Sequence, residues 1–174
     1  MPSPPLSFDP IAEARRQWIA HGWTEAADGM AAVTSIMRVH QLLLGQLDDI
    51  LRPFGLTFAR YEVLQLLFFS RRGTLPLGKI GARLQVAPGA VTNAVDRLED
   101  AGLVRRRPHP TDGRTTLASI SARGRKRVLA ATADLNAVFA DLEMSAAQLG
   151  QLFALLGRLR AAGGDPVRAG ARTP

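Results

Sequence analysis

The sequence predicts a mostly helical α+β protein with one short β-hairpin, and three observations point to it. Apolar residues recur every three or four positions along most of the chain, which is typical of amphipathic helices. Residues 103–121 break this pattern, because they read as two short strands around the turn-rich sequence PHPTDG. Hydrophobic residues make up 47% of the 174 positions, which suffices for one core. We therefore expect a single folded body with two tails.

The N-terminal third is expected to form two helices behind a tail. Residues 1–9 are rich in Pro and Ser, and we expect them to be disordered. Asp9 and Pro10 suit the N-cap and the first position of a short helix that ends near residue 22. A longer helix should follow over about residues 25–51, where apolar residues keep helical spacing.

Three more helices are expected between residues 57 and 102, and a tight turn joins the last two. Thr57 is a suitable N-cap for the first of them, and Pro88 suits the first position of the third. Residues 85–87 leave room only for a tight turn between the second and the third. Two short helices joined in this way are typical of a helix-turn-helix.

The helix expected over residues 88–100 has an outer face that suits the major groove of DNA. Val91, Val95 and Leu98 cluster on one side, and the opposite side is small and polar. Short polar side chains can reach base edges, although an ordinary solvated face is the alternative. An acid on this face repels phosphate unless it accepts from a cytosine amino group or orients a neighbouring arginine. The candidate contacts are Gly89, Thr92, Asn93, Asp96 and Arg97.

The predicted hairpin and the residues after it are strongly basic. Eight cations and a single acid, Asp112, lie between residues 103 and 127, whereas a surface made only for solubility mixes both signs. We expect Arg114 to enter a minor groove, with its guanidinium held in a bidentate pair by Asp112. Arg106 and Arg107 are expected to neutralise phosphates alongside. A charged, exposed turn is the alternative.

Two further helices are expected after the hairpin, with Ser121 and Ser145 as their caps. The last helix and the first two present more apolar surface than a small lobe can cover, which indicates dimerisation; burial within the chain is the alternative. We accordingly expect N-terminal dimerisation helices at 10–56, a winged helix-turn-helix lobe at 57–127, C-terminal dimerisation helices at 128–162 and a disordered tail at 163–174.

The run from Leu77 to Arg127 resembles the winged helix-turn-helix of the MarR family of bacterial transcriptional regulators. Three motifs carry the resemblance: RLEDAGLVRR at the junction of helix and hairpin, PTDGR at the hairpin tip, and Ile-Ser-x-x-Gly at residues 120–124. The likeness covers roughly residues 30–160. It implies a sequence-specific regulator, which we expect to be a repressor, that binds a pseudo-palindromic operator as a homodimer.

The resemblance also implies release from DNA by a small aromatic or anionic effector, bound between the dimerisation helices and the winged lobe. Such a ligand shifts the population toward a lobe spacing that does not fit the operator. A regulator that works without an effector is the alternative, and core or interface packing is the alternative role for the aromatic residues. The candidate effector contacts are Trp18, His40, Arg60, Tyr61 and Glu62.

Composition and missing motifs argue against other classes. Lys and Arg outnumber Asp and Glu by 22 to 15, so a polyanion is a natural partner, and a non-specific architectural DNA-binding protein is a further alternative. The chain has no cysteine, scattered histidines and no catalytic motif, so we expect no enzyme, no metal and no cofactor. Without a signal peptide or an apolar run of 18 or more residues, we expect a cytoplasmic protein with no membrane partner.

Overall fold

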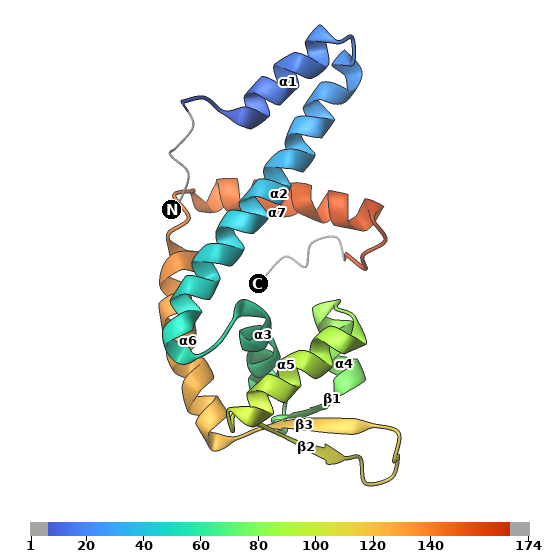
Figure 1. Cartoon of the computed structure of the whole chain (residues 1–174), viewed down its shortest axis with the longest axis vertical. Coiled ribbons are helices and arrows are strands. Elements are labelled where there is room, and N and C mark those ends of the chain that lie inside the picture. Colours follow the sequence, from blue (N-terminus) through green and yellow to red (C-terminus); the bar gives the residue numbers. More distant parts are fainter. Residues whose placement is uncertain (1–6, 168–174) are drawn as a thin grey trace. The chain divides into compact units, whose positions relative to one another are not determined.

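The computed structural model describes residues 7–167 and consists mainly of helices, with one small sheet (Figure 1). Residues 1–6 and 168–174, which belong to the two predicted tails, lie outside the described residues. The predicted mostly helical α+β fold with a winged lobe is confirmed. Within the described range the elements are α1 (Pro10–Ala20), α2 (Thr24–Leu51), the 3₁₀ turn η1 (Arg52–Phe54), α3 (Phe58–Phe69), β1 (Thr74–Pro76), α4 (Leu77–Leu84), α5 (Pro88–Asp100), β2 (Val104–Pro108), β3 (Thr116–Ile120), α6 (Ala122–Ala140) and α7 (Ala146–Ala162).

The chain divides into two compact units, with the boundary inside α6. The first unit ends at Ala133, and the second begins at Asp134. The first unit therefore contains α1 to α5 and all three described strands, so the predicted helix-turn-helix and hairpin belong to one body.

Helices α1 and α2 form a helical hairpin within the first unit (Figure 1). Asp9 caps α1 as predicted, because its Oδ1 accepts from the backbone N–H groups two and three residues further on, at 2.8 and 3.3 Å. Arg15 on α1 pairs with Asp28 on α2 at 2.6 Å. At the turn, the rings of Trp18 and Trp23 meet edge to face with centroids 5.3 Å apart. These contacts hold the two helices together.

The apolar stripe predicted on α2 is only partly buried in the single chain. Leu47 and Leu51 lie in the core. Val33, Met37 and Leu44 are exposed, with 56%, 61% and 38% of their surfaces accessible. Helix α2 before Leu47 thus presents apolar side chains that this unit does not cover.

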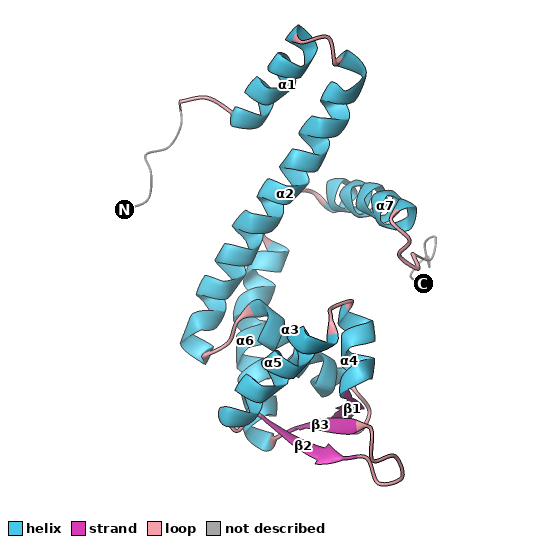
Figure 2. Ribbon diagram, turned by 45° about the vertical axis from the view of Figure 1, so that its right-hand side comes forward, coloured by secondary structure: helices cyan, strands magenta, loops and turns pink. Residues whose placement is uncertain are grey.

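The sheet has the order β1-β3-β2 and is antiparallel throughout (Figure 2). The predicted hairpin corresponds to β2 and β3, and Leu117, Ala118 and Ile120 of β3 are buried. Strand β1 was not predicted. It pairs Thr74 with Ser119 across a hydroxyl hydrogen bond of 2.8 Å. A three-residue strand whose partner is distant in sequence leaves no local pattern to detect.

Helices α4 and α5 are joined by the predicted three-residue turn. Gln85 ends α4 in the left-handed conformation, with φ of 57°. The two helices pack closely, because a Cβ on Gly81 would lie 3.2 Å from Cγ2 of Val91. Val91, Val95 and Leu98 are all buried, so the predicted inner face of α5 is confirmed.

Helix α7 of the second unit begins at the predicted cap. Ser145 Oγ accepts from the backbone N of Gln148 at 3.3 Å, and Gln148 Oε1 accepts from the backbone N of Ser145 at 2.8 Å. This reciprocal pair satisfies two backbone donors that a helix start leaves open. Phe153 and Leu155 on this helix are 73% and 57% exposed.

The first turn of α6 lies against the chain that leaves α5. Ser121 caps α6 as predicted, since its Oγ accepts from the backbone N of Gly124 at 2.9 Å. The backbone N of Ser121 donates to the carbonyl oxygen of Leu103 at 3.0 Å. A Cβ on Gly124 would lie only 2.2 Å from that same oxygen. Glycine is therefore required here by space and not by its backbone angles.

We expect Gly124→Ala to destabilise the protein by about 1–3 kcal/mol, because the added methyl group displaces backbone at a packed junction. Urea denaturation followed by circular dichroism measures the change. Gly78→Ala on α4 is the matched control, since the added Cβ meets no other element within 4 Å among the described residues and helix propensity improves. Equal stability of the Gly124 variant and the native chain would contradict the packing described for this junction.

Candidate nucleic-acid interface

The outer face of α5 brings the predicted base-contacting residues together. Gly89, Thr92, Asn93 and Arg97 are exposed, and all of them line one surface hollow along the helix. The hydroxyl of Thr92 donates to the carbonyl oxygen of Pro88 at 3.1 Å. The helix therefore presents short polar groups outward and buries its apolar groups inward, as a recognition helix must.

Asp96 lies on the same hollow and has a partner that the sequence did not predict. Its Oδ1 forms an ion pair with Nη1 of Arg106 on β2, and no ion pair with Arg97 occurs among the described residues. Of the two roles weighed for Asp96, the orientation of Arg97 is not found, and acceptance from a cytosine amino group stays a prediction. Asp96 thus forms its ion pair with a residue of the neighbouring strand and not with the next residue of its own helix.

Arg106 is held by a second acid that the sequence reasoning missed, Glu99. The backbone N of Arg106 donates to Glu99 Oε1 at 2.7 Å, and Arg106 Nε donates to Glu99 Oε2 at 2.7 Å. The hydrogen bond from the backbone of Arg106, and after it the one from its side chain, lowers the pKa of Glu99 below its usual value. In return, the side-chain hydrogen bond to Glu99 raises the pKa of Arg106. In this conformation the Arg106 guanidinium has two acidic partners, and its expected contact with phosphate stays a prediction.

The wing tip is organised by Asp112, though not in the way predicted. Its Oδ1 accepts from the backbone N of Arg114 at 3.1 Å, and its Oδ2 accepts from the hydroxyl of Thr115 at 2.6 Å. The hydrogen bond from the Thr115 hydroxyl is the main cause that lowers the pKa of Asp112, and the hydrogen bond from the backbone N–H of Arg114 adds to it. No ion pair joins this carboxylate to the Arg114 guanidinium in the described part of the chain. In place of the expected bidentate pair, the Asp112 side chain stabilises a turn by accepting a hydrogen bond from the backbone two residues further on.

Several wing cations remain available to an outside partner. Arg105, Arg107 and Arg114 are exposed and take part in no ion pair within residues 7–167. Arg127 instead donates to the carbonyl oxygen of Phe54 and so serves the fold. The basic run of the sequence thus contains two kinds of cation: some have partners within the fold, and others have no acidic partner among the described residues. Arg114 at the hairpin tip belongs to the second kind.

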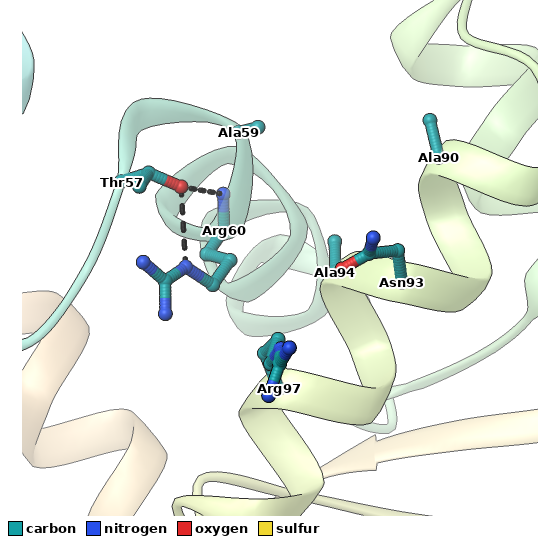
Figure 3. A pocket seen from close by; sticks show the side chains of 7 residues that line it. All are labelled: Thr57, Ala59, Arg60, Ala90, Asn93, Ala94 and Arg97. Carbon is teal, nitrogen blue, oxygen red and sulfur yellow. Dashed lines mark hydrogen bonds between the residues drawn. The ribbon is translucent and has the colours of Figure 1, made fainter.

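A pocket of about 410 Å³ lies between the start of α3 and α5 (Figure 3). Its polar lining includes Arg60, Asn93 and Arg97. Thr57 holds Arg60 in place on the α3 side of the pocket, because its Oγ1 accepts from the backbone N and from Nε of Arg60 at 3.4 and 3.2 Å. The pocket therefore shares Asn93 and Arg97 with the outer face of α5.

Of the five candidate effector residues, Arg60 lines this pocket and the other four lie elsewhere in the first unit. Trp18 packs on Trp23 between α1 and α2, and His40 is exposed on α2. Tyr61 is buried, with its hydroxyl 3.0 Å from Oγ1 of Thr132, which favours the packing alternative for this residue. The expected crevice between the dimerisation helices and the winged lobe therefore stays a prediction.

Glu62, the fifth candidate, is half-buried on α3. Burial raises the pKa of this carboxyl above its usual value, because the charged form loses solvation. The group thus prefers its neutral form more than a surface glutamate does.

Neither a metal site nor a membrane span emerges from the described residues. No group of three or more His, Asp or Glu side chains within residues 7–167 is placed to hold a metal ion. Across the same range, the helices are too short or too polar to traverse a bilayer.

An exposed polar helix beside a basic β-hairpin defines the class of winged helix-turn-helix DNA-binding proteins. Comparison with known proteins agrees. The model of the MarR family matches residues 56–116. The MarR family transcriptional regulator Sco5413 from Streptomyces coelicolor is 52% identical in sequence, with a TM-score of 0.73 over 81% of this chain and 99% of that one. The chain belongs to the MarR family, whose members are transcription regulators and not enzymes.

Two further relatives are informative. Sco3205, another MarR family regulator from Streptomyces coelicolor, has been solved in complex with DNA; it is 28% identical, with a TM-score of 0.69 over 78% of this chain and 90% of that one. The transcriptional regulator MhqR of Bacillus subtilis is 33% identical over 89 residues, which span 51% of this chain. That match covers 60% of the length of MhqR, so the likeness to this curated relative is partial.

Proposed function

We propose that this protein represses transcription by binding a pseudo-palindromic operator in double-stranded DNA as a homodimer. One observation carries the proposal: the exposed polar face of α5 lies in the same compact unit as a hairpin whose outer arginines have no acidic partner among the described residues. A helix in the major groove and a basic wing beside it together supply base readout and phosphate attraction. A bound dimer then blocks the DNA it covers.

The residues divide the work by their chemistry. Gly89 lets the backbone of α5 approach the DNA closely, and Thr92 and Asn93 offer donors and acceptors to base edges. Arg107 neutralises phosphate, and Arg114 enters the narrow minor groove, where the potential is most negative. Arg97 reads a base or fixes the backbone from the same helix face. Asp96, Arg106 and Asp112, which the sequence placed among the DNA contacts, hold the wing and its tip instead.

Dimerisation follows from apolar surface that neither unit covers by itself. In the first unit, Val39 and Leu42 of α2 are 52% and 54% exposed, and in the second, Leu159 joins Phe153 of α7 at 56% and 73%. Contiguous apolar patches of this kind mark interaction sites. We assign residues 10–56 and 128–162 to the dimer interface and 57–127 to the DNA-binding lobe, so that two lobes meet successive half-sites.

The pocket of Figure 3 supports release by a small anionic ligand. Arg60 and Arg97 bring two guanidinium groups to it, and Asn93 adds an amide. A ligand held there occupies two residues that we assign to DNA, so the two binding events oppose each other. The same fold acting without an effector is the second candidate, and titration of operator-bound protein with small aromatic carboxylates separates the two.

We expect Arg114→Ala to weaken operator binding by about 1–3 kcal/mol, because a groove contact is lost. Arg16→Ala is the matched control: it removes the same charge from α1, where Arg16 forms an ion pair with Glu13 of its own helix. Fluorescence anisotropy at about 0.15 M salt compares both variants with the native chain. If the two variants bind equally well, the role given to the wing tip is wrong.

We also expect sedimentation equilibrium to give a dimer at micromolar protein concentration. Replacing Met37 and Phe153 together by Glu should shift the mass toward that of the monomer, because charge then enters the proposed interface. A native chain that sediments as a monomer throughout would remove the two-lobed arrangement and with it the recognition of a palindrome.

A further inference from the structure

Three hydrogen bonds tie the first strand of the wing to the recognition helix, and all three involve Arg106. Its backbone N and its Nε each reach one oxygen of Glu99 at 2.7 Å, and its Nη1 reaches Asp96. We call Asp96, Glu99 and Arg106 the wing clamp. Charge-assisted hydrogen bonds of this kind are stronger and more directional than neutral ones.

The position of β2 in the sheet explains how the clamp is possible. Strand β2 is an edge strand, because the order is β1-β3-β2 and Arg106 is opposite Ala118 of β3. An edge strand leaves alternate backbone N–H groups without a strand partner. Glu99 accepts from the Arg106 N–H on that open side, while its second oxygen takes the side chain of the same residue. One carboxylate thus fixes both the backbone and the direction of Arg106.

The acids of the clamp stand where simple electrostatics disfavours them. Asp96 and Glu99 lie in the second half of α5, and negative charge near a helix C-terminus opposes the helix dipole. Both also lie on the helix that faces the phosphate backbone in the proposed complex. The side chains of the clamp are 33–45% exposed, so these ion pairs contribute little to stability. Their geometry, and not their energy, is what they offer the fold.

We propose that Glu99 and Arg106 are positioning residues for DNA binding. They fix the angle between the wing and α5, so that the hairpin tip meets the minor groove when α5 enters the major groove. Arg106 consequently makes no phosphate contact of its own. This inference rests on the proposed operator binding, but the clamp itself exists in the free protein and can be measured there.

The sharpest test is Glu99→Ala, because electrostatics and positioning predict opposite results. Removing a negative charge beside DNA should strengthen binding if charge alone matters. Loss of the clamp should weaken it. Asp100→Ala is the matched control: it removes the same charge one residue further along α5, where Asp100 has no hydrogen bond to Arg106 and only raises its pKa through space.

Both variants are made in the full chain and tested on a duplex that the native protein selects from a random library. We expect Glu99→Ala to lose about tenfold or more in affinity for the selected duplex and none for random duplex, since loosened support degrades a specific site first. Asp100→Ala should bind the selected duplex as well as the native chain or more tightly. Equal or tighter binding by Glu99→Ala overturns the proposal.

The salt dependence of binding to random duplex is the second readout. Arg107→Gln should lower the slope of log K against log salt by about one, because a phosphate contact is lost. Arg106→Gln removes the same charge, and we expect it to leave the slope unchanged. A decrease equal to that of Arg107→Gln would show that Arg106 contacts phosphate and would refute its assignment.

Amide hydrogen exchange in the free protein separates failure of the clamp from failure of the proposed function. The backbone N–H of Arg106 should exchange faster in Glu99→Ala than in Asp100→Ala or the native chain, because only the first variant removes its acceptor. If library selection enriches no sequence, operator binding is refuted while the exchange result still stands. If exchange is the same in all three proteins, the clamp is refuted whatever the DNA result.

Discussion

Burial of one face of α5 is the constraint on which the rest of the structure depends. Val91, Val95 and Leu98 are at most 2% exposed, and they fix the rotation of the helix about its own axis. Once that rotation is set, Asn93 and Arg97 must point outward, and Asp96 and Glu99 must come within reach of β2. A small rotation of α5 would therefore remove the polar face and the wing clamp together.

The sequence predicted most of what is local. The caps Asp9, Thr57 and Ser145 were placed correctly, because capping depends on residues at most three positions apart. The inner face of α5 was likewise predictable from helical spacing. Strand β1 was missed because its three residues gain their structure only from β3, a partner far along the chain.

The partners of charged side chains were predicted least well from the sequence. Asp96 was expected either to accept from a cytosine amino group or to orient Arg97, and Asp112 was expected to hold the guanidinium of Arg114, but the direction of each carboxylate depends on how the chain is arranged in space. Asp96 meets Arg106 across the gap between helix and strand, and Asp112 turns its oxygens to the backbone. One signal was available: Glu99 follows Asp96 by three residues, so both acids share a helix face just before a basic strand.

Operator recognition by the native chain is the central claim, and one measurement tests it most directly. The full-length protein is titrated at about 0.15 M salt onto a duplex selected from a random library, in the presence of excess random duplex, since non-specific phosphate binding weakens at that ionic strength. Our account predicts tight binding that the competitor does not remove and a stoichiometry of two chains per duplex. Binding that random DNA abolishes would contradict it, because the protein would then hold DNA by charge alone.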